Sequence, residues 1–167
     1  TALFLGSNMG NYSPEDAKEF LFHLSSVLDK GDNLLIGFDL VKDPGIILKA
    51  YNDPHGHTRR FNLNLLHRLN RELGADFDPE DFIHYPVYDP EANAAKSYLI
   101  SKKRQTIYIS ELDIHIALDK WEYIYTEMSR KFTLSEIESL SDQTGYRIVE
   151  NYFDDREYFV DSLWEKI

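Results

Sequence analysis

The first forty residues consist of an apolar segment, a capped helix and a second apolar segment, and this order restricts the fold more than any other feature. Residues 2–5 are apolar and end at Gly6, as in a short buried strand. Residues 34–40 are apolar with little alternation, as expected of a strand that is covered on both faces. A helix between two such strands joins them in parallel through a right-handed crossover. The start of the chain therefore predicts a βαβ unit of a parallel sheet.

The helix between these two strands carries clear start and stop signals. Ser13 is an N-cap, Pro14 takes the first helical position, and Asp16 lies three residues after the cap. Apolar residues then recur at helical spacing as far as Leu28, and Gly31 follows as a stop. We therefore expect a helix from Pro14 to about Leu28.

The end of the chain also carries clear signals, for one helix and two strands. Thr133 and Glu136 have the spacing of a capping box, and the helix that they begin ends before Gly145. Residues 146–152 and 159–163 then predict two strands joined by a short turn.

Between these two ends the alternation of strand and helix is not continued. A short helix is predicted over 44–51, and a longer helix is expected to begin with Thr58 as its cap and to end at Gly74. Turn residues then separate five predicted strands, over 83–88, 96–102, 106–109, 112–118 and 123–126. We therefore predict two parts, an α/β layer formed by residues 1–40 and 132–167 and an inserted α+β domain over 41–131.

The charge and the amino-acid content exclude several classes of protein. Lysine and arginine number 18 against 29 aspartate and glutamate residues, and the net charge of −11 argues against nucleic acid and anionic membranes as partners. Small molecules or proteins are the better expectation as partners. The chain has no cysteine, which excludes disulfides, thiolate nucleophiles and zinc–thiolate sites. This content is compatible with a reducing cytosol, and we expect a cytoplasmic protein.

Neither a transmembrane segment nor a signal peptide is predicted, because no apolar run is long enough to span a bilayer. The chain starts at Thr1, without Met, directly before an apolar segment. A native terminus rarely begins at a strand, so we expect the chain to be a fragment of a longer protein.

Six segments together resemble the ergothioneine-pathway histidine Nα-methyltransferase family, which also includes fungal N-methyltransferases of tryptophan derivatives. They are 4–11 (FLGSNMGN), 40–44 (LVKDP), 50–53 (AYND), 61–66 (FNLNLL), 70–78 (NRELGADFD) and 126–132 (TEMSRKF). The resemblance implies the C-terminal part of a Rossmann-like class I methyltransferase with an α+β substrate-binding insertion. It also implies S-adenosylmethionine as the methyl donor, with contacts mainly on strands and loops upstream of residue 1.

The resemblance carries four acceptor-binding residues over to this chain. Asn11 matches the family asparagine that holds the α-amino and carboxylate groups of the substrate, and Tyr51 matches a tyrosine that binds the carboxylate. Glu127 and Ser129 match the pair that meets the imidazole ring. The resemblance therefore implies an α-amine N-methyltransferase of an amino acid, histidine above all.

Two further positions belong to the predicted substrate site. Gly6 opens a loop at the C-terminal end of a strand, where α/β enzymes place substrate groups. Ser97 stands, in an ungapped comparison, where the family has a methionine beside the imidazole. This departure leaves open a different amino acid or amine as the acceptor.

The chemistry of these residue types agrees with such roles, although each has a simpler reading. The carboxamide of Asn11 can accept from an ammonium group and donate to a carboxylate, but an asparagine in a turn can also bond its own backbone. Glu127 and Ser129 lie two apart, so on an extended segment they point the same way. Glu127 can accept from an imidazole N–H, but it could equally face solvent, with Arg130 and Lys131 as plain surface charge.

Other readings remain open at this point. The complete protein could be a degenerate, non-catalytic methyltransferase, or the insertion could serve as a protein-interaction domain. His55 and His57 suggest a metal site only weakly, because no third ligand is evident, and we expect none.

Overall fold

The computed structural model describes residues 1–167 and divides into two compact units. Unit 1 consists of Thr1–Asp43, Asp89–Ala94 and Met128–Ile167, and unit 2 consists of Pro44–Tyr88 and Ala95–Glu127. The sequence places the boundaries of an insertion at 40/41 and 131/132, a few residues away from these. The sequence pattern also does not separate the short segment Asp89–Ala94, which belongs to unit 1, from the strands on either side of it.

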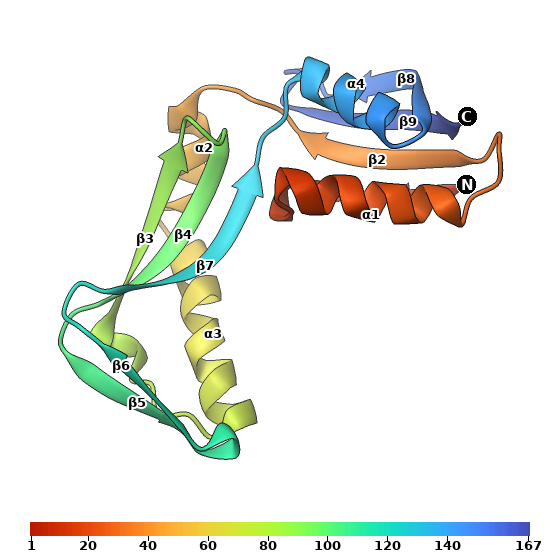
Figure 1. The fold of residues 1–167 in the computed structure, drawn as a ribbon. Coiled ribbons are helices and arrows are strands. Elements are labelled where there is room, and N and C mark those ends of the chain that lie inside the picture. The colour runs from red at the N-terminus through yellow and green to blue at the C-terminus, as the bar shows by residue number, and fades with distance from the viewer. The chain divides into compact units, whose positions relative to one another are not determined.

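A four-stranded sheet forms the centre of unit 1, with the strand order β1-β2-β9-β8 (Figure 1). The strands are β1 (Ala2–Phe4), β2 (Asn33–Asp39), β8 (Tyr146–Phe153) and β9 (Phe159–Lys166). β1 pairs with β2 in parallel, which confirms the predicted βαβ unit. β9 is antiparallel to both β2 and β8, so the end of the chain enters the sheet as a hairpin.

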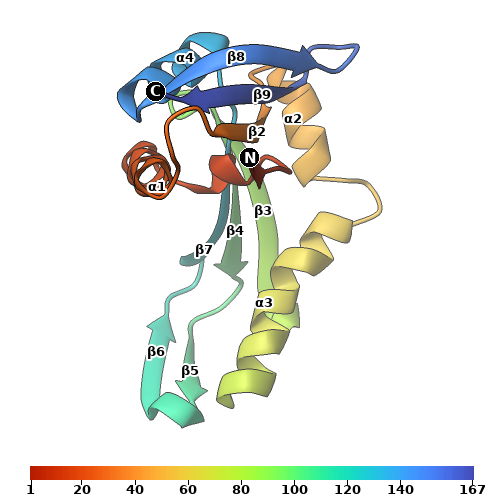
Figure 2. The same ribbon diagram turned by 90° about the vertical axis from the view of Figure 1, so that its right-hand side faces the viewer.

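Two helices cover the same face of this sheet, α1 (Pro14–Ser26) and α4 (Leu134–Gln143) (Figures 1 and 2). The predicted caps are both present. The Ser13 hydroxyl accepts from the Asp16 amide at 3.1 Å, and Thr133 and Glu136 form both bonds of a capping box. α1 ends two residues before Leu28, because the Val27 amide turns back to the Leu24 carbonyl.

The core of unit 1 is aromatic and reaches into the loop after β1. Phe38 lies 5.8 Å from Trp164 and 5.0 Å from Phe132, measured between ring centroids. Met9, in the short 3-10 helix Asn8–Asn11, is fully buried in the same cluster. The loop after β1 is therefore anchored in the core.

Unit 2 combines two helices with a three-stranded sheet and a hairpin. The elements are α2 (Pro44–Tyr51), α3 (His57–Leu73), β3 (Phe82–Asp89), β4 (Ala94–Ser101), β5 (Gln105–Ile109), β6 (Ile114–Leu118) and β7 (Tyr123–Arg130), with 3-10 turns at Pro79–Asp81 and Ser110–Leu112. The last residue of β3, the first residue of β4 and the last three residues of β7 belong to unit 1. The strand order is β3-β4-β7, and β5 pairs with β6 in antiparallel fashion. Leu63 and Leu66 of α3 pack with Phe82 and Leu99, so the long helix lies along the sheet (Figure 2).

The start of α3 differs from the expectation. The helix begins at His57, and its N-cap is Gly56, whose φ of 69° lies in the left-handed region. The carboxylate of Asp53 accepts from the amides of His57 and Thr58 at 2.9 and 2.8 Å. Thr58 is therefore not the cap, because an aspartate further upstream takes over the capping bonds. These backbone N–H groups, with Thr58 the larger influence, hold the pKa of Asp53 well below its usual range.

At 17 residues α3 is the longest helix of the chain. It is amphipathic, with buried Leu63 and Leu66 opposite exposed charged residues. No helix in the structure has both the length and the apolar character that crossing a membrane requires.

Candidate functional site

In unit 1, the loop that follows β1 is held by hydrogen bonds within the loop and to the end of β2. Gly6 and Ser7 both have positive φ, 80° and 59°, and so reverse the chain directly after the strand. The Ser7 hydroxyl accepts from the Asp39 amide at 3.1 Å, and Asn8 Nδ2 donates to the Leu5 carbonyl at 2.9 Å. Gly6 thus shapes a rigid turn, a conformation that glycine adopts without strain.

Asn11 and Ser129, both predicted from the sequence, are brought together in unit 1 through Gly10. A Cβ atom on Gly10 would lie 2.7 Å from the Arg130 carbonyl oxygen, 3.1 Å from the Arg130 amide nitrogen and 3.4 Å from Ser129 Oγ. The end of β7 therefore packs directly on the loop. Asn11 follows Gly10 and is exposed, whereas Ser129 is buried.

Lys131 contacts the candidate site residue Ser129, and the sequence analysis did not identify it. Its side chain is only 1% exposed, its Nζ lies 2.8 Å from a carboxylate oxygen of Asp39, and it donates to Ser129 Oγ at 2.9 Å. Lys42 pairs with the same carboxylate. Because Lys131 takes a lone pair of the Ser129 hydroxyl, that hydroxyl is oriented and its proton remains available for another acceptor. The reading of Lys131 as plain surface charge is therefore wrong.

In unit 2, Tyr51 and Glu127 line the same open pocket. The pocket measures about 310 Å³. Its remaining lining residues are Ala50, His57, Thr58 and Phe61. Tyr51 is the last residue of α2 and Glu127 lies on β7, so residues far apart in the chain meet here.

Asn62 does not line this pocket but donates a hydrogen bond to Glu127. It is a second residue to which the sequence analysis gave no role. It is 3% exposed, and its Nδ2 donates to the Thr58 carbonyl at 3.1 Å and to Glu127 Oε2 at 3.4 Å. Its Oδ1 accepts from the Thr126 hydroxyl at 2.6 Å. An asparagine within an apolar helix face was the available signal, because asparagine is unfavourable inside helices.

Ser97 does not line the pocket. It is fully buried on β4, and its hydroxyl lies 3.2 Å from Nε2 of His84. Its carbonyl lies 3.0 Å from the Thr126 hydroxyl, so it contacts the support of Glu127 and not the open pocket. Burial, followed by the nearby Arg59 charge, lowers the pKa of His84 below its ordinary value.

His55, in the loop before α3, and His57, the first residue of that helix, both contact an arginine. Arg60 donates to the His55 carbonyl at 2.9 Å, and its guanidinium lies 2.8 Å from His57 Nδ1. Nowhere does the structure gather three His, Cys, Asp or Glu side chains in an arrangement that could hold a metal ion.

Known proteins resemble the chain over nearly its whole length. The family model of the SAM-dependent, histidine-specific methyltransferases matches residues 1–166. The histidine N-alpha-methyltransferase of Mycobacterium tuberculosis is 41% identical over 130 residues, which are 78% of this chain and 40% of that protein. The protein of the same name from Mycolicibacterium smegmatis is 37% identical over 145 residues, 87% of this chain and 45% of that protein. The chain thus spans less than half the length of these relatives.

A solved structure resembles the fold. The CcbJ methyltransferase from Streptomyces caelestis superposes with a TM-score of 0.51 at 9% identity, covering 99% of this chain and 59% of that one. At this identity the likeness concerns the fold alone, and it confirms the predicted α/β methyltransferase class.

Proposed function

Because this chain belongs to the family of SAM-dependent, histidine-specific methyltransferases, we propose that the protein transfers a methyl group from S-adenosylmethionine to the α-amine of histidine. The observation that carries the proposal is the pocket in which a carboxylate, Glu127, and a phenol, Tyr51, lie together. A carboxylate can accept an imidazole N–H, and a phenol can donate to a substrate carboxylate. The names of the two mycobacterial relatives support histidine as the acceptor.

We assign the acceptor contacts as follows. Asn11 binds the α-amine and the carboxylate, Tyr51 binds the carboxylate, and Glu127 and Ser129 bind the imidazole ring. Asn11 is exposed in the loop that follows the C-terminal end of β1, a parallel strand, and this position supports its role. Lys131 supports the role of Ser129, because it leaves the hydroxyl proton free for a ring nitrogen.

Gly6 and Ser97 are assigned supporting roles in the acceptor site. Gly6 sets the turn that leads to Asn11, and its positive φ of 80° supports this role. Ser97 acts on the position of Glu127 indirectly. The contact of its carbonyl with the Thr126 hydroxyl, which also bonds Asn62, supports this role.

The residues of this chain contribute orientation and not acid–base chemistry. When bound, S-adenosylmethionine supplies an electrophilic methyl group, and the amine needs a free lone pair aimed at that carbon. Positioning is then the main contribution of the protein. We assign no contact with S-adenosylmethionine to this chain, because the polar groups of the loop after β1 already have partners: Asn8 and Gly10 bond carbonyls of the loop, and Ser7 accepts from the Asp39 amide of β2.

The proposal is tested with the complete protein, S-adenosylmethionine and a panel of amino acids, with the products identified by mass spectrometry. We expect Nα-methylated histidine, formed with a higher kcat/KM than any other methylated amino acid. A better acceptor than histidine would overturn the substrate assignment. Binding of S-adenosylmethionine without any methylated product would show a non-catalytic member of the family.

A variant of Asn62 tests the support of the pocket. We expect Asn62→Leu to raise KM for histidine about 2- to 10-fold, because a hydrogen bond contributes about 0.5–1.5 kcal/mol. Asn64→Leu changes an exposed asparagine on the same helix and should leave KM unchanged. Steady-state kinetics and thermal unfolding of both variants are the measurements. An equal KM for Asn62→Leu and the wild type would limit Asn62 to a structural role.

A further inference from the structure

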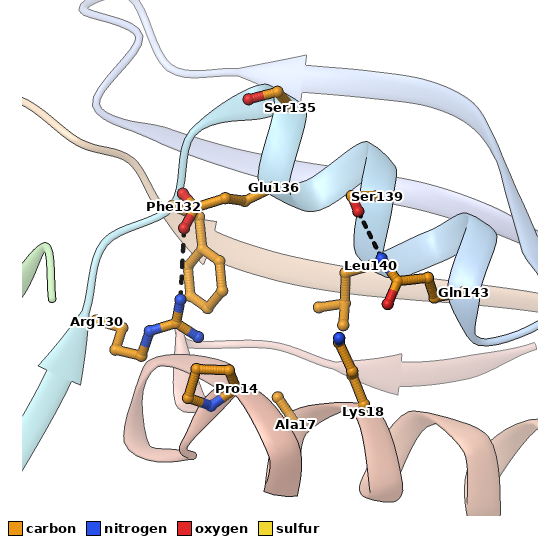
Figure 3. Close-up of a pocket in the computed structure, with 10 residues that line it drawn as sticks. All are labelled: Pro14, Ala17, Lys18, Arg130, Phe132, Ser135, Glu136, Ser139, Leu140 and Gln143. Carbon is orange, nitrogen blue, oxygen red and sulfur yellow. Dashed lines mark hydrogen bonds and ion pairs between the residues drawn. The ribbon is translucent and has the colours of Figure 1, made fainter.

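A second pocket lies within unit 1, between α1 and α4, and it contains none of the residues assigned to the acceptor (Figure 3). It measures about 280 Å³. Its apolar floor consists of Ala17, Phe132 and Leu140, all buried. Above this floor Lys18 and Arg130 supply two positive charges, in a chain whose net charge is −11.

Arg130 is a nearly buried cation with an incomplete set of partners. Its side chain is 13% exposed, and its guanidinium lies 5.0 Å over the ring of Phe132. Its one hydrogen bond runs from Nη2 to Oε1 of Glu136 at 3.4 Å. A guanidinium has five N–H donors and usually binds a carboxylate in bidentate fashion at shorter distances. A buried charge needs a close partner, and the ion pair with Glu136 supplies only one long contact to this guanidinium.

Glu136 cannot pair with Arg130 through both carboxylate oxygens, because one of them caps α4. Its other oxygen, Oε2, accepts from the Thr133 amide at 2.7 Å and from the Thr133 hydroxyl at 2.9 Å. Turning the carboxylate toward Arg130 would break the capping box of α4. The single long contact therefore follows from the fold and leaves Arg130 able to bind a second carboxylate.

Lys18 faces this region from the opposite helix. Figure 3 shows its side chain rising from α1 toward Leu140 and Gln143 of α4. The amide nitrogen of Gln143 donates to the Ser139 hydroxyl at 2.7 Å, which leaves the hydroxyl proton free to donate into the pocket. The pocket thus offers two cations, one of them paired with Glu136 through a single long contact, and a hydroxyl donor above an apolar floor.

We propose that this pocket binds a small organic carboxylate, with the carboxylate on Arg130 and Lys18 and a short apolar tail on Phe132 and Leu140. The volume of about 280 Å³ lies at the small end of ligand sites and suits a ligand of a few carbon atoms. The apolar floor favours such a ligand over inorganic phosphate, which would leave Phe132 and Leu140 uncovered.

The experiment is calorimetric titration of the complete protein with acetate, propionate and butyrate, and separately with inorganic phosphate, in the presence of saturating histidine. Histidine is included so that carboxylate binding at the acceptor residues does not contribute. We expect affinity to rise from acetate to butyrate, because each added methylene group covers apolar floor. Phosphate should bind more weakly than butyrate. Phosphate binding as tight as that of butyrate would overturn the assignment of the ligand class.

Variants locate the binding. Arg130→Gln should weaken butyrate binding about tenfold or more, and Lys18→Gln should weaken it about two- to fivefold, because the exposed lysine forms a weaker ion pair. Lys30→Gln removes an equal charge from an exposed position of unit 1 outside the pocket and is the matched control. Lys18→Gln keeps the test decisive if Arg130→Gln does not fold. Undetectable binding of all three carboxylates, or equal affinity in wild type and Lys18→Gln, would overturn the proposal.

Discussion

Replacing Glu127 with Gln should lower kcat/KM of the complete protein for histidine by about 10- to 100-fold. A hydrogen bond between a carboxylate and a ring N–H contributes about 1.5–3 kcal/mol, and a neutral carboxamide recovers only part of it. The NH₂ group of the carboxamide cannot accept a hydrogen bond from a ring N–H or from Nδ2 of Asn62, which donates to Glu127 in the wild type. Initial rates over a range of histidine concentrations give the change.

The matched control for this variant is Glu111→Gln, which removes the same charge from an exposed position of unit 2. It should leave kcat/KM for histidine unchanged. An equal loss in both variants would attribute the effect to net charge and not to ring recognition. If Glu127→Gln methylates histidine at the wild-type rate, the assignment of Glu127 to the imidazole is wrong.

Gly10→Ala should destabilise unit 1 by about 1–3 kcal/mol, the usual cost of an added methyl group in a packed region. The new Cβ would lie 2.7 Å from the carbonyl oxygen of Arg130, a backbone atom of β7 that has no rotamer by which to move away. Either the loop or the end of β7 must shift. The shift should also reduce methyl transfer, because it displaces Asn11 and Ser129. Chemical denaturation measures the first effect and kcat/KM the second.

Asn11→Ala separates the two effects. Asn11 is exposed and adjacent to Gly10, so its truncation should change stability by less than about 0.5 kcal/mol while lowering kcat/KM.

A Gly10→Ala protein that unfolds at the wild-type denaturant concentration would show that the loop tolerates a side chain and that its packing against β7 is not required.

Local signals predicted most of the secondary structure. The caps at Ser13 and Thr133 are correct because each bond joins residues only three apart, so the sequence contains both partners. The parallel pairing of β1 and β2 follows from a helix too long for a hairpin connection. The start of α3 was misplaced because Gly56 and Asp53 together replace the expected threonine cap, through a turn that no propensity rule describes.

Buried polar residues were the least predictable part of the candidate site. Lys131 reads as a surface charge in the sequence, since nothing near it indicates that Asp39 will meet its ammonium group. Asn62 stands out as unusual in a helix, but its bond to Thr126 joins residues 64 apart and is formed only in the folded unit. Burial of a polar group depends on a partner, and that partner is distant in the chain.

The sequence by itself determined which segments become strands and helices, and through the family resemblance it nominated the acceptor residues. Only the tertiary structure decided which of them meet. It brings Tyr51 to Glu127 in one unit and the Asn11 loop to Ser129 in the other, and it buries Ser97 against His84 outside the pocket lining. Hydrogen bonds between residues a few positions apart can be predicted from the sequence, because both partners lie in the same short segment. Packing between distant segments depends on the shape of the whole unit, which no short stretch of sequence contains.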